Sequence, residues 1–276
     1  MPSLFDFISR HRKLFVLTGA GCSTDSGIPD YRDADGNWKR SPPVSFQAFM
    51  GSAAVRQRYW ARSFVGWRHL RRAGPNAAHQ SLARLEQQGR LELLLTQNVD
   101  GLHQAAGSMQ VMDLHGRLDR VRCMDCESLE SREELQAELL RCNGAWGRLE
   151  GQVAPDGDAD LEGLSFAEFV APSCFRCGGI LKPDVVFFGE SVPRERVDEA
   201  MQRLERADAV LVVGSSLMVY SGYRFVQAAV QAGKPVAAVN LGRTRADELL
   251  SLKVSEPCAS ALLAASSTAL QTQVLP

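Results

Sequence analysis

Six short apolar runs, separated by segments of helical composition, constrain the fold of this chain more than any other feature. Their aliphatic residues form nearly continuous stretches, as in strands that are buried on both faces of a sheet. Strands that alternate with helices in this way predict an α/β fold with a doubly wound, parallel, Rossmann-like sheet. The predicted strands are Leu14–Thr18, Leu91–Thr96, Met109–Leu114, Asp184–Phe188, Ala209–Val213 and Pro235–Asn240.

Polar side chains follow the second and third of these strands. Asn98 and Asp100 are two residues apart, so an extended backbone aims both side chains the same way. His115 directly follows the third strand. Since the carboxyl ends of parallel strands face the ligand crevice in open α/β sheets, these three groups could converge on a ligand. They could equally cap strand ends and fill the core, and these segments alone leave both interpretations open.

The first strand runs into a glycine-rich turn, Gly19–Arg32. Bare glycines let a backbone approach a pyrophosphate, and a helix that starts after the turn would add free N–H donors. Thr24 stands where the usual dinucleotide fingerprint has its last glycine, so an ordinary strand–helix turn is the alternative. Further polar residues end later strands, at 214–216 and at Asn240. Together these segments predict a dinucleotide crevice along one edge of the sheet.

Two C-x-x-C pairs interrupt the alternating pattern. Cys123 and Cys126 form the first pair, and Cys174 and Cys177 form the second. Four thiolates suit a closed, tetrahedral zinc site with a structural role, and the doubling of the motif argues against a redox dithiol. We therefore expect one structural Zn²⁺ in a small inserted module. Cys142, which lies between the pairs, is expected to be a small buried thiol.

The composition restricts the class of protein. Lys and Arg total 31 and Asp and Glu total 32, and the net charge of −1 argues against a nucleic-acid partner bound through bulk charge. No apolar run reaches the roughly 18–20 residues of a membrane span. No secretory signal is evident, and the odd number of seven cysteines points away from disulfides. We expect a cytoplasmic protein, with the mitochondrial matrix an option only if a transit peptide is missing from this sequence.

The pattern also predicts how the chain is divided. We expect residues 1–117 and 183–276 to form the Rossmann-like domain and residues 118–182 to form the zinc-binding module, with Gly144–Gly163 as an insertion loop. The helical segment 45–72 would complete the small lobe. Its arginines and aromatic residues could bind nucleic acid or anions, but an amphipathic helix with its arginines at the surface is the favoured interpretation.

Several motifs, taken in order along the chain, resemble the sirtuins, which are NAD-dependent protein lysine deacylases. The resemblance covers nearly the whole chain. Segments 56–62, 64–67, 154–158 and 219–225 are most similar to the class II branch, which includes mitochondrial sirtuin four. Cys22 departs from the aliphatic residue usual in the glycine turn, and we expect it to pack in the core. The matching motifs are 19–32, 96–103, 114–116, the two cysteine pairs, 182–190, 214–217 and 239–240.

The resemblance implies that NAD is the co-substrate and lies across the predicted crevice. His115 would be the catalytic base, supported by Asn98 and Asp100, and this role needs a pKa near 7, which histidine supplies without large perturbation. Acyl-lysine peptides would bind as an added strand along Val185, Val186 and Phe187 and along Leu217–Tyr220. The NAD phosphates would contact Gly19, Ala20, Gly21 and Ser23; the nicotinamide half would contact Asp30, Tyr31, Arg32, Gln97, Asn98 and Asp100; the adenosine half would contact Gly214, Ser215, Ser216, Asn240, Leu241, Gly242 and Cys258.

Tyr59 and Arg62 bear on the choice of acyl group. They are three residues apart on a predicted helix and so share a face. They resemble a Tyr-x-x-Arg pair that binds the carboxylate of acidic acyl groups in some sirtuins, where the planar fork of arginine suits a carboxylate. Arg62 could instead pair with an acidic neighbour or face solvent. Plain deacetylation or broad deacylation is the favoured interpretation.

The resemblance therefore implies transfer of an acyl group from lysine to ADP-ribose, with release of nicotinamide. Mono-ADP-ribosyl transfer to a protein would use the same NAD site and is the alternative. A non-catalytic NAD sensor is a third interpretation, and the presence of Asn98, Asp100 and His115 argues against it. The expected partners are acyl-lysine proteins or peptides, without nucleic acid or membrane, and a monomer is favoured.

Overall fold

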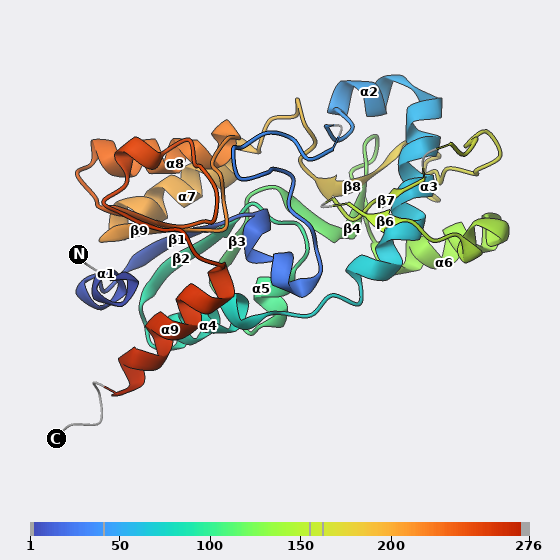
Figure 1. Ribbon diagram of the computed structural model, residues 1–276. Coiled ribbons are helices and arrows are strands. Elements are labelled where there is room, and N and C mark those ends of the chain that lie inside the picture. The colour runs from blue at the N-terminus through green and yellow to red at the C-terminus, as the bar shows by residue number, and fades with distance from the viewer. Residues whose placement is uncertain (1–2, 41, 155, 162, 272–276) are drawn as a thin grey trace.

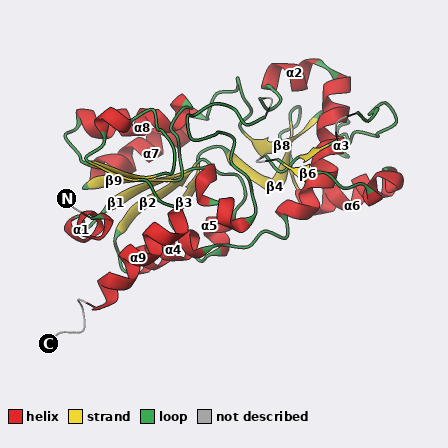
Figure 2. Ribbon diagram, viewed as in Figure 1, coloured by secondary structure: helices red, strands yellow, loops and turns green. Residues whose placement is uncertain are grey.

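The structure is a computed structural model that describes residues 3–40, 42–154, 156–161 and 163–271. Two parts lie next to each other (Figure 1). One is a sheet with helices on both faces, and the other is a smaller group of strands and helices around β4, β8 and α3. Figure 2 shows that the two parts are joined by several loops.

The large sheet has six strands in the order β11-β10-β9-β1-β2-β3, and every neighbouring pair is parallel. This confirms the predicted doubly wound α/β fold. β11 was not predicted, because its three residues are too short to stand out as an apolar run. The strands are β1 Leu14–Thr18, β2 Leu91–Thr96, β3 Val111–Asp113, β9 Ala209–Val213, β10 Val236–Val239 and β11 Leu252–Val254.

Both faces of this sheet are buried, which explains the continuous apolar runs. Along β1, Leu14 and Val16 face a core that includes α1, α4 and α9. Phe15 and Leu17, which alternate with them, face the core formed with α7 and α8. The helices that cover the sheet are α1 Leu4–Arg10, α4 Ala77–Gln87, α5 Leu102–Ala105, α7 Arg194–Arg206, α8 Tyr220–Gln231 and α9 Cys258–Gln271, and a short 3-10 helix, η4 Asp247–Leu249, lies between β10 and β11.

The small part contains an antiparallel sheet in the order β5-β4-β8. The strand predicted at Asp184–Phe188 lies three residues earlier, at β8 Leu181–Val185, and pairs with β4 in this sheet instead of joining the large one. Its apolar composition could not distinguish the two sheets. The division of the chain at residues 117 and 183 stays a prediction. The strands are β4 Gly116–Cys123, β5 Leu129–Ser131 and β8, with a separate pair β6 Gln152–Val153 and β7 Ala159–Asp160.

The helices of the small part pack around an aromatic core that includes Trp60, Phe64 and Phe169. The predicted helical segment 45–72 is divided at Ser52, whose side chain caps a new helix. The predicted insertion loop contains the β6–β7 pair. Cys142 is exposed, so the prediction of a buried thiol at this position was wrong. The elements are α2 Phe46–Gly51, α3 Ala53–Leu70, α6 Arg132–Cys142 and the 3-10 helix η3 Gly144–Arg148.

Candidate functional site

A cavity of about 1030 Å³ lies at the carboxyl ends of the strands of the large sheet. Chain connections leave β1 and β9 toward opposite sides of the sheet, because β2 and β10 lie on their outer flanks. Such a topological switch point is where open α/β sheets bind ligands. The residues that follow β1, β2, β9 and β10 all contribute to the cavity wall.

The glycine turn after β1 packs against the turn after β9. The Gly21 N–H donates to the Gly214 carbonyl oxygen at 2.8 Å, and Gly214 has a φ of +62°. A Cβ at Gly214 would lie 2.2 Å from the backbone nitrogen of Cys22. Glycine is therefore needed at these positions because the two turns are in contact. This need is separate from the predicted close approach of a pyrophosphate. The expected helix start is replaced by two 3-10 helices, η1 Ala20–Cys22 and η2 Thr24–Ser26.

Ser23 joins the glycine turn to the polar residues that follow β2. Its hydroxyl donates to Asp100 Oδ2 at 2.7 Å and accepts from Asn98 Nδ2 at 3.0 Å. Asn98 Nδ2 also donates to the Gly19 carbonyl oxygen at 3.1 Å. Gln97 Nε2 donates to Ser215 Oγ at 2.8 Å. These bonds hold one polar wall together across three strands.

His115 lies on the cavity wall with both ring nitrogens bonded. Nδ1 lies 3.0 Å from the Gln97 carbonyl oxygen, which can only accept, so Nδ1 carries the proton in the neutral ring. Nε2 therefore accepts from the Ser221 hydroxyl, at 2.8 Å. Ser221 was missed as a site residue. It lies in the segment 219–225, which resembles the class II branch, but nothing in that segment marks this serine as a partner of His115.

Burial lowers the pKa of His115 from 6.5 to about 4, while its bond to Gln97 opposes the shift and the charges of Arg196 and Arg224 add to it. The expectation of an unperturbed pKa near 7 is therefore not met. The imidazole is neutral at pH 7 and its lone pair is on Nε2. This lone pair becomes available to a ligand when the Ser221 hydroxyl moves away. The ring can take a proton, as a weaker base than a free imidazole.

Residues at the end of the glycine turn and just beyond it line the cavity. The Arg32 guanidinium lies 4.1 Å from the centre of the Trp38 ring and donates to the Gly36 carbonyl oxygen at 2.7 Å. Trp38 also contacts Tyr31 and Phe188 edge to face. Lys39 pairs with Asp30. Trp38 was not predicted as part of the site, although an aromatic residue in a polar loop is a usable signal.

The structure brings nearly all the predicted site residues to this one cavity. Val185, Val186 and Phe187 line it, and Tyr59 reaches it with its ring 5.3 Å from that of Phe187. The other predicted residues on its wall are Gly19, Ala20, Gly21, Ser23, Asp30, Tyr31, Arg32, Gln97, Asn98, Asp100, His115, Gly214, Ser215, Ser216, Asn240, Leu241, Gly242 and Cys258.

Arg62 is the predicted residue that the structure does not bring to the cavity wall. Its Nε lies 3.6 Å from Asp158 Oδ2, and the two side chains are 24% and 5% exposed. Burial and the neighbouring Asp156 raise the pKa of Asp158 well above its usual value, and Arg62 opposes this shift. Arg62 therefore acts as the counter-ion of a buried carboxyl group.

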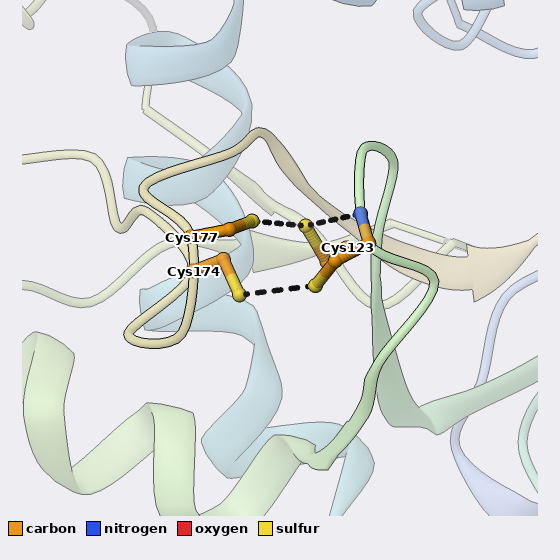
Figure 3. Close-up of side chains that lie close together, drawn as sticks. Cys123, Cys174 and Cys177 are labelled. Atoms are coloured by element: carbon orange, nitrogen blue, oxygen red, sulfur yellow. Dashed lines mark hydrogen bonds between the residues drawn. The ribbon is translucent and has the colours of Figure 1, made fainter.

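The four cysteines of the two C-x-x-C pairs come together beside the small sheet. Figure 3 labels three of them, with Cys123 facing Cys174 and Cys177. Cys123 Sγ lies 3.5 Å from Cys177 Sγ, and Cys126 Sγ lies 3.8 Å from Cys174 Sγ. Four thiolates on Zn²⁺ with bonds of about 2.3 Å would be separated by about 3.8 Å in a tetrahedron. The cluster therefore fits a structural zinc ion, with no ligand position left for catalysis.

Comparison with known proteins identifies the family. The Sir2 family model matches residues 19–221, which include the glycine turn, the polar wall and all four cysteines. The chain belongs to the Sir2 family. A protein of Xanthomonas campestris pv. campestris named NAD-dependent protein deacetylase is 67% identical over 261 residues, covering 95% of this chain and 89% of that protein. A protein of the same name from Bordetella bronchiseptica is 66% identical over 258 residues, covering 94% of both.

Solved structures of Sir2 proteins have the same fold. One, of Sir2 with a p53 peptide and NAD⁺, has a TM-score of 0.73 and 30% identity, covering 97% of this chain and 96% of that one. Another, of a mutant Sir2 homologue with ADP-ribose, has a TM-score of 0.76 and 31% identity, covering 99% and 98%. The sirtuin resemblance is thus confirmed at the level of the family. None of the described helices is long and apolar enough to cross a bilayer.

Proposed function

We propose that this chain is an NAD-dependent protein deacetylase of the sirtuin type. The observation that carries the proposal is a single cavity at the topological switch point, whose wall holds the glycine turn, the Ser23–Asn98–Asp100 network and His115. The names of the relatives and the NAD-containing Sir2 structure support the same activity. NAD would be the co-substrate, acetyl-lysine peptides would be the substrates, and the four cysteines would hold a structural zinc ion.

The polar wall would position the co-substrate. Bound NAD would supply the ADP-ribose acceptor and the nicotinamide leaving group. Gln97, Asn98 and Asp100 would hold the nicotinamide half, and their bonds to Ser23 and Ser215 fix them before the ligand arrives. Backbone groups of the glycine turn would face the phosphates. The segment Asp30–Arg32 would close the cavity and exclude water, which limits simple hydrolysis of NAD. The adenosine half would contact Gly214, Ser215, Ser216, Asn240, Leu241, Gly242 and Cys258.

His115 would act as the general base. Its neutral ring, with the proton held on Nδ1 by Gln97, presents Nε2 to the cavity. A ribose hydroxyl that replaced the Ser221 hydroxyl would give its proton to Nε2 while its oxygen bonds to the acyl carbon, and the lysine nitrogen would leave that carbon as the free amine. Asn98 and Asp100 would support this step by orienting the ribose. Val185, Val186 and Phe187 would hold the peptide as an added strand.

We also propose that the chain belongs to the class II branch. Two of the segments that resemble this branch contact each other: Arg62 in 56–62 pairs with Asp158 in 154–158. Gly66, in 64–67, lies so close to this loop that a Cβ would be 2.2 Å from the Gly157 carbonyl oxygen. Three of the four resembling segments therefore pack into one region of the small part, and their joint resemblance supports the proposal. The predicted cytoplasmic location and the monomeric state stay predictions.

The test is a product analysis with zinc-loaded protein, NAD and an acetyl-lysine peptide. We expect deacetylated peptide, nicotinamide and O-acetyl-ADP-ribose in equal amounts, and no deacetylation without NAD. NAD alone should raise the melting midpoint, because it binds only the folded chain. ADP-ribosylated protein without peptide deacetylation would indicate the transferase instead. Binding of NAD without any turnover would indicate a sensor.

A further inference from the structure

A second cluster of metal-binding side chains lies behind the polar wall of the cavity. Cys22, His79 and His103 each offer a ligand atom, and these atoms lie within 4.8 Å of one another. The three residues come from η1, α4 and α5, and they are 1%, 0% and 1% exposed. Nothing in the proposed reaction uses them.

His103 brings to this cluster a buried ring nitrogen whose lone pair is free. Its Nε2 lies 2.9 Å from the Thr18 hydroxyl, which donates its own proton to Thr96, so Nε2 is the N–H donor. Nδ1 therefore carries the lone pair, and it has no hydrogen-bond partner in the described part of the chain. A buried nitrogen without a partner is uncommon and calls for a ligand or a functional reason.

His79 connects the cluster to the cavity. Its Nε2 lies 3.5 Å from Ser23 Oγ, and its ring centre lies 4.7 Å from that of His103. Burial lowers the pKa of both histidines, so both rings are neutral at pH 7. Neither ring therefore has to release an extra proton before it binds a metal. Ser23 lines the cavity, which gives an ion a route to the cluster.

We propose that Cys22, His79 and His103 form a second metal site, which takes Zn²⁺ and, when filled, weakens NAD binding. A thiolate and two imidazoles are the ligands that Zn²⁺ prefers, with a fourth position for water or Ser23 Oγ. Tetrahedral ligands on zinc are separated by about 3.3–3.8 Å, so the side chains must move inward by about 1 Å. The Cys22 thiol loses its proton to solvent on binding.

His79 links metal binding to the polar wall. Its Nδ1 accepts from the Asn76 N–H at 3.2 Å, so the proton of the neutral ring is on Nε2. Binding through Nε2 moves this proton to Nδ1, breaks the bond to Asn76 and withdraws the ring from Ser23. Because these changes cost free energy, a cation that binds nitrogen and sulfur ligands weakly will not fill the site. Mg²⁺ is such a cation, since it prefers oxygen ligands. With Ser23 Oγ as its fourth ligand, the ion draws this hydroxyl away from Asn98 and Asp100, and NAD therefore binds less well.

The test compares the zinc-loaded wild type with Cys22→Val, which restores an aliphatic side chain at a position that packs in the core. Cys22→Ala serves if valine disturbs folding, and Cys142→Ser is the matched control, since Cys142 is an exposed thiol outside both clusters. Each protein is equilibrated with micromolar free Zn²⁺, and bound zinc is measured. We expect two zinc ions per chain in the wild type and in Cys142→Ser, and one in Cys22→Val.

A second readout is the thermal shift caused by NAD. Zn²⁺ should reduce the shift in the wild type, and at least about tenfold more Zn²⁺ should be needed in Cys22→Val. Equal zinc content in wild type and Cys22→Val, or a single zinc ion in the wild type, would overturn the proposal. Zinc content is independent of the reaction, so these outcomes stand whether or not the protein is a deacetylase.

Discussion

The cavity and the four-cysteine cluster both collect residues from distant segments, but by different physical means. The cavity wall consists of strand ends whose positions are set by two buried apolar cores, and its polar groups bond to each other. Of the cysteines, Cys123 ends β4 and the other three lie in loops. Cys123 and Cys174 are buried against the aromatic core, but Cys126 and Cys177 are exposed. The cavity should therefore keep its shape without any ligand, whereas the cysteine cluster should need its metal.

The largest expected effect is that of Cys174→Ser. Structural zinc sites contribute about 10–16 kcal/mol, which is as much as the stability of a whole domain, so the small lobe should lose its fold while the large sheet retains its own core. We expect protein without zinc that aggregates and has no deacetylase activity. Metal analysis and limited proteolysis, with Cys142→Ser as control, measure this. Active, fully folded Cys174→Ser protein without zinc would break the comparison.

A substitution at Gly214 tests how closely the two turns of the cavity pack. Gly214→Ala places a Cβ 2.2 Å from the Cys22 nitrogen and also strains a φ of +62°, so we expect a loss of about 2–4 kcal/mol in the free energy of unfolding. Gly233→Ala is the matched control, because Gly233 has a φ of +70° and a Cβ there would have no neighbouring atom within 4 Å. It should lose only about 1 kcal/mol. Denaturant unfolding of both variants gives the difference, and equal losses would show that the turns are not tightly packed.

Arg62 tests whether the acyl preference depends on a charge. Arg62→Met removes the counter-ion of the buried Asp158, so we expect a loss of roughly 2–4 kcal/mol in the free energy of unfolding. Asp158→Asn in the same chain should restore part of it. Acetyl and glutaryl versions of one peptide should lose activity equally. A loss confined to the glutaryl peptide would instead place the guanidinium in contact with the acyl group.

The smallest effect concerns pH. The neutral form of His115 is the base, and it persists until the pH falls through a pKa of about 4, so the acidic limb of kcat/KM should lie near pH 4 and not near 6.5. Ser221 donates to Nε2 and favours the neutral ring. Ser221→Ala should therefore raise the limb by about 0.5–1 pH unit. An acidic limb near 6.5 in the wild type would contradict the burial of His115.

The sequence was most informative where short segments carry their own chemistry. The buried strands, the glycine turn, the polar residues after β2 and the paired cysteines each follow from local pattern. The bond of Ser221 to His115 could not be predicted, and the acidic partner of Arg62 could not be named, because each depends on a contact between segments far apart in the chain. The pKa of His115 could not be predicted for the same reason, since burial by distant elements sets it. The strand at β8 was assigned to the wrong sheet, because an apolar run does not specify its partner.

The most direct test of the cavity as the place of reaction is the turnover of His115→Ala on an acetyl-lysine peptide with NAD. The zinc content and the NAD thermal shift are measured on the same sample, and His69→Ala, on α3 and away from the cavity wall, is the control. We expect a folded protein with wild-type zinc and an NAD shift, whose turnover is lower by a factor of roughly 10²–10⁴. Turnover close to that of the wild type would contradict the role of His115 and the assignment of the site.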